Sequence, residues 1–226
     1  MVKEFIDELN GNRVEGELIR TFLYSFVISI IIIGIAYFIK LKEIPGFIDK
    51  YGLYLLLASI SIALISSLIR QVRAYKEFAC MSGMMIGMTA GMISGFSIGL
   101  YVGATNGMFV GSILGILVGI FIGLWMGKCC GIMGIMEGLM SGFMGGLMGA
   151  MTAIMMINDN LKLAVGLLSI VSFIILILLN YMVYKEMKEN ERQRKEDHTI
   201  TVLLTIILIF IIAWVMIYGP RSSLFG

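Results

Sequence analysis

Cysteine, methionine and one acidic residue lie close together in the segment KCCGIMGIMEG. Cys129 and Cys130 are adjacent, and Met133 and Met136 follow within about two helical turns. Glu137 comes next. Thiolate and thioether sulfur are soft ligands that select Cu(I) over harder cations. The segment therefore predicts a soft-metal site, with Glu137 as a charge-balancing ligand or proton acceptor.

A second group of sulfur ligands precedes it in the chain, at Cys80, Met84 and Met88. We expect all three cysteines at the cytoplasmic mouth of the protein, each near a helix start, where the helix dipole stabilises a thiolate. The alternative interpretation is that the cysteines are small apolar residues and that methionine is a flexible filler beside glycine. The sequence leaves both interpretations open.

Glu137 is the only acidic residue inside a predicted membrane span, about 10 Å from its cytoplasmic end. An ionisable side chain at membrane depth is costly and by default marks a functional site. It could serve as an ion ligand, a proton relay or a partner of Lys128.

The predicted helix that holds Glu137 separates two residue types. At 100° per residue, its glycines fall on one side and its methionines on the other, together with Glu137. One face is expected to pack against helices, and the other forms a ladder of sulfur or faces lipid. The ladder comprises Met133, Met136, Met140, Met144, Met148, Met151 and Met155.

The elements that must position these residues are membrane helices. The chain is 59% hydrophobic and only 14% charged, with a mean hydropathy of +0.96, whereas soluble domains are about a quarter charged. The composition predicts an all-α membrane protein, a bundle of about seven transmembrane helices. The expected spans are Thr21–Phe38, Tyr51–Ile69, Cys80–Val102, Gly107–Met126, Gly131–Ile157, Leu163–Tyr184 and Thr199–Tyr218.

Lysine and arginine set the expected orientation in the cell membrane. Twelve fall on the side of the N-terminus and five on the other, which predicts a cytoplasmic N-terminus and an outer C-terminus. The chain divides into a cytoplasmic tail (1–20), two spans with their loops (21–78), a Gly/Met-rich three-helix core (79–157) and two last spans (158–226) with a charged cytoplasmic linker (185–198). We find no basic patch for nucleic acid, and no nucleophile–base pair or nucleotide loop of an enzyme.

Glycine recurs at intervals of four from Gly83 to Gly131, thirteen times in all. Such spacing lets membrane helices approach closely, and so predicts a glycine-zipper core of helices three to five or an oligomer contact. The stripe drifts about 40° per glycine, so each span needs more than one neighbour, which predicts that spans three and four lie at the bundle centre. The predicted packing residues are Gly83, Gly87, Gly91, Gly95, Gly99, Gly103, Gly107, Gly111, Gly115, Gly119, Gly123, Gly134, Gly138 and Gly142.

Residues 82–95 and 133–146 form a weak internal repeat of glycine and methionine, and Asn106–Gly107 is a tight-turn pair between spans three and four. The run CMSGMMIGM…GATNGMF…GKCCGIMG resembles a group of uncharacterised Gly/Met-rich bacterial integral membrane proteins, over about residues 80–157. That resemblance brings no established activity.

At the level of motifs, the Met84–Met88 and Met88–Met92 spacing is similar to copper transporters of the Ctr type. Those have three spans and a methionine-rich extracellular tail, which this chain lacks, so no residue role transfers. The Cys129–Cys130 pair resembles the vicinal cysteines of mercury-uptake membrane proteins.

The leading hypothesis is a membrane transporter or channel for a soft metal ion, Cu(I) above others, that uses these Cys and Met ligands and Glu137. The second is a glycine-zipper scaffold, alone as a homo-oligomer or as a subunit of a membrane complex, in which methionine only fills space. A channel for a hard ion gated at Glu137 is a third.

Overall fold

The computed structural model describes residues 14–39, 48–75, 78–187 and 198–220. In this part of the chain seven α-helices each contain a stretch of 20 to 27 residues apolar enough to cross a membrane. The predicted all-α bundle is confirmed. The helices are α2 (Val14–Ile39), α3 (Leu53–Ala74), α4 (Cys80–Asn106), α5 (Met108–Gly127), α6 (Gly131–Met155), α7 (Leu161–Met187) and α8 (His198–Tyr218).

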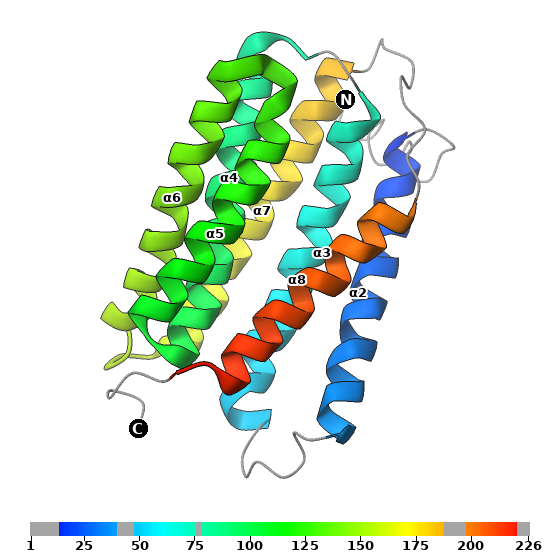
Figure 1. Cartoon of the computed structure of the whole chain (residues 1–226). Helices are drawn as coiled ribbons and strands as arrows, with labels where there is room; N and C mark the ends of the chain where they lie inside the picture. The colour runs from blue at the N-terminus through cyan, green and yellow to red at the C-terminus, as the bar shows by residue number, and fades with distance from the viewer. Residues whose placement is uncertain (1–13, 40–47, 76–77, 188–197, 221–226) are drawn as a thin grey trace.

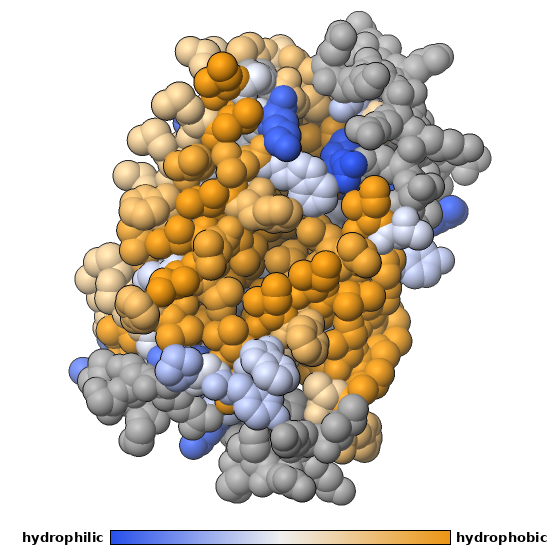
Figure 2. All heavy atoms as spheres, viewed as in Figure 1, coloured by the Kyte–Doolittle hydropathy of each residue, from blue (hydrophilic) through white to orange (hydrophobic). Residues whose placement is uncertain are grey.

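The helices run up and down the bundle, so that α2 begins and α8 ends at opposite ends (Figure 1). Helices α4, α5 and α6 gather on one side, and α2, α3 and α8 on the other. Helix α7 packs against α3 and α4 and joins the two groups. Figure 2 shows apolar residues covering the middle of the visible face, with polar residues towards both ends. This distribution suits a bilayer, whose hydrocarbon core is about 30 Å thick.

The most buried helices are α3 and α4, with 67% and 72% of their apolar stretch inside the protein. Only 44% of α5 is buried. The prediction that span four lies at the centre of the bundle is therefore wrong, although span three does. Helix α5 packs mainly on α4 and α6, and its opposite side leaves Phe109, Leu117 and Phe121 exposed.

The three consecutive helices α4, α5 and α6 meet in layers of small residues. In one layer, a Cβ added to Gly91 would lie 3.0 Å from the Cα of Gly123 and 3.0 Å from the carbonyl oxygen of Gly138. Each further layer is four residues away in every helix. The layers are Gly87/Gly127/Gly134, Gly91/Gly123/Gly138, Gly95/Gly119/Gly142, Gly99/Gly115/Gly146 and Gly103/Gly111/Ala150. Backbone touches backbone there, because no side chain intervenes.

The drift of the glycine stripe is visible along α5. Near its start, a Cβ on Gly111 would meet Gly103 of α4, and near its end one on Gly127 would meet Gly134 of α6. Gly115, between them, faces both neighbours. The prediction that each stripe needs more than one partner helix is confirmed, since the stripe passes from one neighbour to the next.

A single residue, Gly107, connects α4 to α5. Its φ of 104° and ψ of 172° belong to a region that is essentially restricted to glycine. The Asn106 amide Nδ2 donates a hydrogen bond to the carbonyl oxygen of Val215, 2.9 Å away, and so ties this end of α4 to α8. The expected tight turn at Asn106–Gly107 is present.

The two copies of the weak repeat lie side by side on α4 and α6, which run in the same direction. In the repeat Gly87 corresponds to Gly138, but in the structure Gly87 faces Gly134. The copies are therefore displaced by one helical turn, about 6 Å.

Candidate functional site

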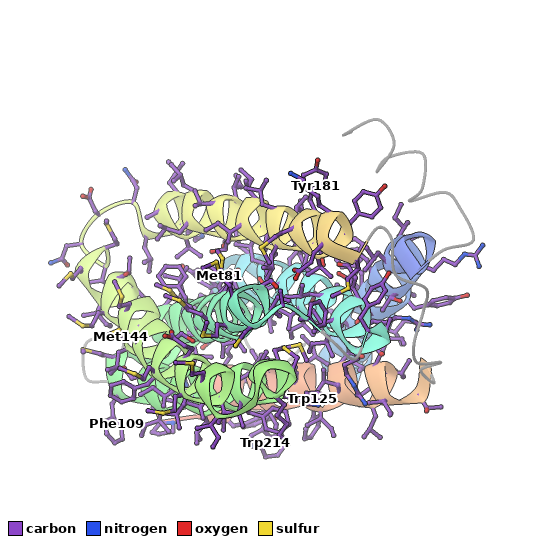
Figure 3. The ribbon with its side chains drawn as sticks, turned by 90° about the horizontal axis from the view of Figure 1, so that it is seen from above. Met81, Phe109, Trp125, Met144, Tyr181 and Trp214 are labelled. Atoms are coloured by element: carbon purple, nitrogen blue, oxygen red, sulfur yellow. The ribbon has the colours of Figure 1, made fainter. Side chains whose placement is uncertain are left out.

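The methionine ladder of α6 lies on the outer surface of the protein. Its seven side chains are between 39% and 73% exposed. Met144, labelled in Figure 3, lies at the periphery of the bundle. From Met133 to Met155 the ladder extends about 33 Å along the helix, as far as the hydrocarbon core is thick. Thioether sulfur thus lines one helix face across a whole membrane thickness.

The ladder faces outward because the glycines opposite it hold α6 against its neighbours. Gly134, Gly138, Gly142, Gly145 and Gly149 are all buried. A Cβ on Gly145 would meet the Met92 carbonyl of α4, while one on Gly142 would meet the backbone of Gly119 in α5. The separation of glycine and methionine faces expected from the helical angles agrees with this burial. Within one copy of the protein, the methionine faces of α4 and α6 do not enclose a path.

The predicted sulfur ligands share one end of the bundle. Cys80 is the first residue of α4 and is exposed. Cys129 is half-buried, and its thiol lies 3.1 Å from the Met126 carbonyl oxygen and 3.9 Å from that of Gly83, in the first turn of α4. The structure therefore brings Cys129 next to the helix turn that begins with Cys80. The side chain of Cys130 lies outside the described residues.

Cys129 lies just before the start of α6 and not within it. It lies in a short 3-10 turn, Lys128–Cys130, and α6 begins only at Gly131, where φ is 69°. The expected position near a helix start is found for Cys80, the first residue of α4, and for Cys129, two residues before α6.

Methionines from two helices add to this end. Met88 is exposed and Met84 is half-buried on α4. Because Gly87 faces Gly134, these residues lie at the same level as Met133 and Met136, both exposed on α6. Among the described residues, no three His, Cys, Asp or Glu side chains cluster as a metal site would require.

Glu137 is exposed on the ladder face of α6. It lies in the second turn of the helix, about 9 Å along α6. The structure records no ion pair between Glu137 and the exposed Lys128. A carboxylate at this depth is costly against lipid tails and is normally covered by protein or reached by water.

Several polar residues that the sequence did not single out are buried between the helices. Tyr101 of α4, fully buried, has its hydroxyl 2.8 Å from that of Ser61 in α3 and 3.0 Å from that of Ser169 in α7. The Gln71 amide donates to the backbone oxygen of Asn180, 3.2 Å away. These bonds fasten α3, α4 and α7 together. An amide or a charged side chain within an apolar span could have pointed to such sites, because these side chains face the interior of the bundle.

Comparison of the chain with protein-family models, with curated proteins and with solved structures finds no match in any of the three. The resemblance to Gly/Met-rich bacterial membrane proteins, and the likeness of motifs to Ctr-type copper transporters, therefore stay predictions. The functional assignment depends on the residues and their geometry.

Proposed function

We propose that the protein is a membrane transporter or channel for a soft metal ion, Cu(I), which moves along the outer methionine face of α6. The observation that supports this best is the ladder itself. Seven thioethers follow one another at steps of three or four residues. Neighbours at such steps on a helix are about 5–6 Å apart, a distance over which an ion can pass from one sulfur to the next.

The path would lie where this face meets another subunit of the same protein. Each ladder then supplies one wall, and the facing ladder supplies the other. Exposure of the ladder in a single copy supports this arrangement, as does the position of Glu137, which a second subunit would shield from lipid. The interior of the α4–α6 unit offers no alternative, because its glycine layers bring backbone against backbone.

The sulfur ligands at the end of the bundle would serve as the entry or exit. Cys80, Cys129 and Cys130 would hold Cu(I) as thiolates, and Met84, Met88, Met133 and Met136 would receive it. Thiolate and thioether ligands prefer Cu(I) to harder cations. Glu137 would balance the single positive charge at the first turns of the path. The Lys/Arg distribution supports a cytoplasmic position for this end.

Transport into proteoliposomes that contain a Cu(I)-selective chelator tests the proposal. Replacing Met136, Met140, Met144 and Met148 together by leucine keeps the face apolar and of similar volume but removes sulfur. We expect this variant to fold normally and to lose most of the uptake. The matched control replaces Met182 and Met216, which lie on α7 and α8, by leucine. Uptake that survives the first set of replacements would refute the proposal.

A structural subunit is the second candidate, and the five layers of small residues favour it. They make α4–α6 a closely packed unit with one apolar face exposed, as an assembly element would have. In that case methionine-to-leucine changes on α6 leave both assembly and cell physiology unchanged, whereas polar replacements such as Met144→Gln break the assembly. The leucine and glutamine variants, compared by size-exclusion chromatography and by Cu(I) uptake, separate the two candidates.

A further inference from the structure

A cavity of about 310 Å³ lies between α2, α3 and α8. These three helices are on the side of the protein away from α6 (Figure 1). Four polar side chains from the three helices line it: Thr21, Ser25, Arg70 and Thr201. Apolar walls are formed by Ile28 and Val202, among others. The cavity therefore has a polar part and a hydrocarbon part.

The polar side chains of this cavity are withdrawn from the surface. Arg70 and Ser25 are each 3% exposed. The Ser25 hydroxyl is buried and has no hydrogen-bond partner among the described residues. A buried hydroxyl without a partner costs free energy, so such a group normally has a ligand or water to bond.

Three of the four polar residues lie at similar depths, and Ser25, seven residues inside the apolar stretch of α2, lies about one helical turn deeper. Thr21 is three residues inside the apolar stretch of α2, Thr201 two residues inside that of α8, and Arg70 four residues from the end of that of α3. At 1.5 Å per residue they are about 3–6 Å from the ends of the three spans. This is the level at which phospholipid headgroups meet the hydrocarbon core.

We propose that the cavity binds the phosphate group of a membrane phospholipid. The planar guanidinium of Arg70 carries five N–H donors, enough to hold two phosphate oxygens in addition to contacts within the protein. The hydroxyls of Ser25 and Thr201 can donate to the remaining oxygens, and Thr21 lies beside them. A phosphate at this place gives the Ser25 hydroxyl the acceptor that it lacks.

The walls of the cavity favour a lipid over free phosphate. Tyr24, which also lines it, is 63% exposed, so the cavity reaches the outer surface of α2. An acyl chain can leave beside Ile28 along this surface. Helix α2 is only 22% buried in the protein, which leaves room for lipid beside it.

Lipid binding to the purified full-length protein in detergent tests the proposal, by native mass spectrometry and by the rise in thermal unfolding temperature. The probes are dioleoylphosphatidylglycerol, dioleoylglycerol without phosphate, and inorganic phosphate alone. We expect only the phosphatidylglycerol to bind and stabilise. Arg70→Gln should weaken its binding by at least about tenfold, as expected for loss of a charge-assisted hydrogen bond. Ser25→Ala should weaken it a few-fold, by about the amount of one neutral bond.

The matched control is Arg73→Gln, because Arg73 lies three residues further along α3 and stacks over the Trp125 ring at 5.0 Å. It should bind the lipid as the unchanged protein does. Equal binding by the Arg70 and Arg73 variants would overturn the proposal, as would equal stabilisation by dioleoylglycerol. If inorganic phosphate alone saturates the cavity, its ligand is a free anion and not a lipid, and the proposal is wrong. Should Arg70→Gln fail to fold, Arg70→Lys, which keeps the charge but loses the planar fork, gives the same comparison.

Discussion

Gly123 and Gly138 are in contact through their backbones, across the interface of α5 and α6. A Cβ added to Gly123 would lie 2.8 Å from the carbonyl carbon of Gly138 and 3.1 Å from its Cα. Real Cβ atoms do not approach backbone so closely, hence one methyl group here must push two helices apart. The relationship repeats in the neighbouring layers, where the same argument applies.

Gly123→Ala is therefore expected to destabilise the protein by about 1–3 kcal/mol or more, as overpacking does in close-packed cores. Gly166→Ala on α7 is the control, because a Cβ there would meet nothing within 4 Å. It should be neutral or stabilise by up to about 1 kcal/mol through helix propensity. Unfolding in mixed micelles with increasing SDS measures both. Equal stability of the two variants would contradict the close packing.

Gly107→Ala is expected to cost about 1–3 kcal/mol, for a different reason. Gly107 has a φ of 104°, which an alanine adopts only with strain. The change alters the turn between α4 and α5 rather than the layers themselves. Thermal unfolding in detergent should show a lower midpoint, whereas Gly34→Ala, in an open position of α2, leaves the midpoint unchanged.

Tyr101→Phe removes the hydroxyl that lies between Ser61 and Ser169. We expect a loss of about 0.5–1.5 kcal/mol, the range measured for hydrogen bonds between membrane helices. The cost stays small because both serines also donate to the backbone, Ser61 to the Leu57 oxygen and Ser169 to that of Val165. A double-mutant cycle of Tyr101→Phe with Ser61→Ala, read by SDS unfolding, should give a coupling energy. Simple additivity of the two changes would mean that no bond joins α3 to α4 there.

If the ladder face of α6 is a contact between subunits, the variant Met144→Cys should form a disulfide-linked dimer. The variant is made in a protein whose three native cysteines have been replaced by serine. Met144 is 57% exposed and lies in the middle of the ladder. Leu178→Cys, on an equally exposed face of α7, serves as the control and should stay monomeric. Non-reducing gel electrophoresis after oxidation in membranes gives the answer. Similar cross-linking at both positions would indicate random collision.

The helices and their packing were largely predictable, because a membrane leaves the backbone few alternatives to a helix. The period of four glycines also indicated close contacts, and its drift indicated several partners. The sequence did not show that α5 lies at the side of the bundle. Glycine spacing indicates which face of a helix makes close contacts, but not whether protein or lipid covers the opposite face of that helix. The direction of the methionine ladder was open for the same reason.

The polar cavity could not be predicted from spacing at all. Thr21, Arg70 and Thr201 come from three helices that are far apart in sequence, and only their tertiary packing brings them together. Arg70 entered the sequence analysis as one of the charges that orient the chain. Its burial, at 3% exposed, is a property of the bundle and not of its neighbours in α3.

The layered helices also bear on the order in which the chain folds. Helices α4, α5 and α6 are consecutive, and their contacts join residues that are inserted into the membrane one after another. Short connections close at a small entropic cost, so this unit can assemble before α7 and α8 have been synthesised. Helix α2, by contrast, packs against α3 and against α8, the last of the described helices. Folding would then begin with α4, α5 and α6, and α2 would gain its final partner only after α8 has been synthesised.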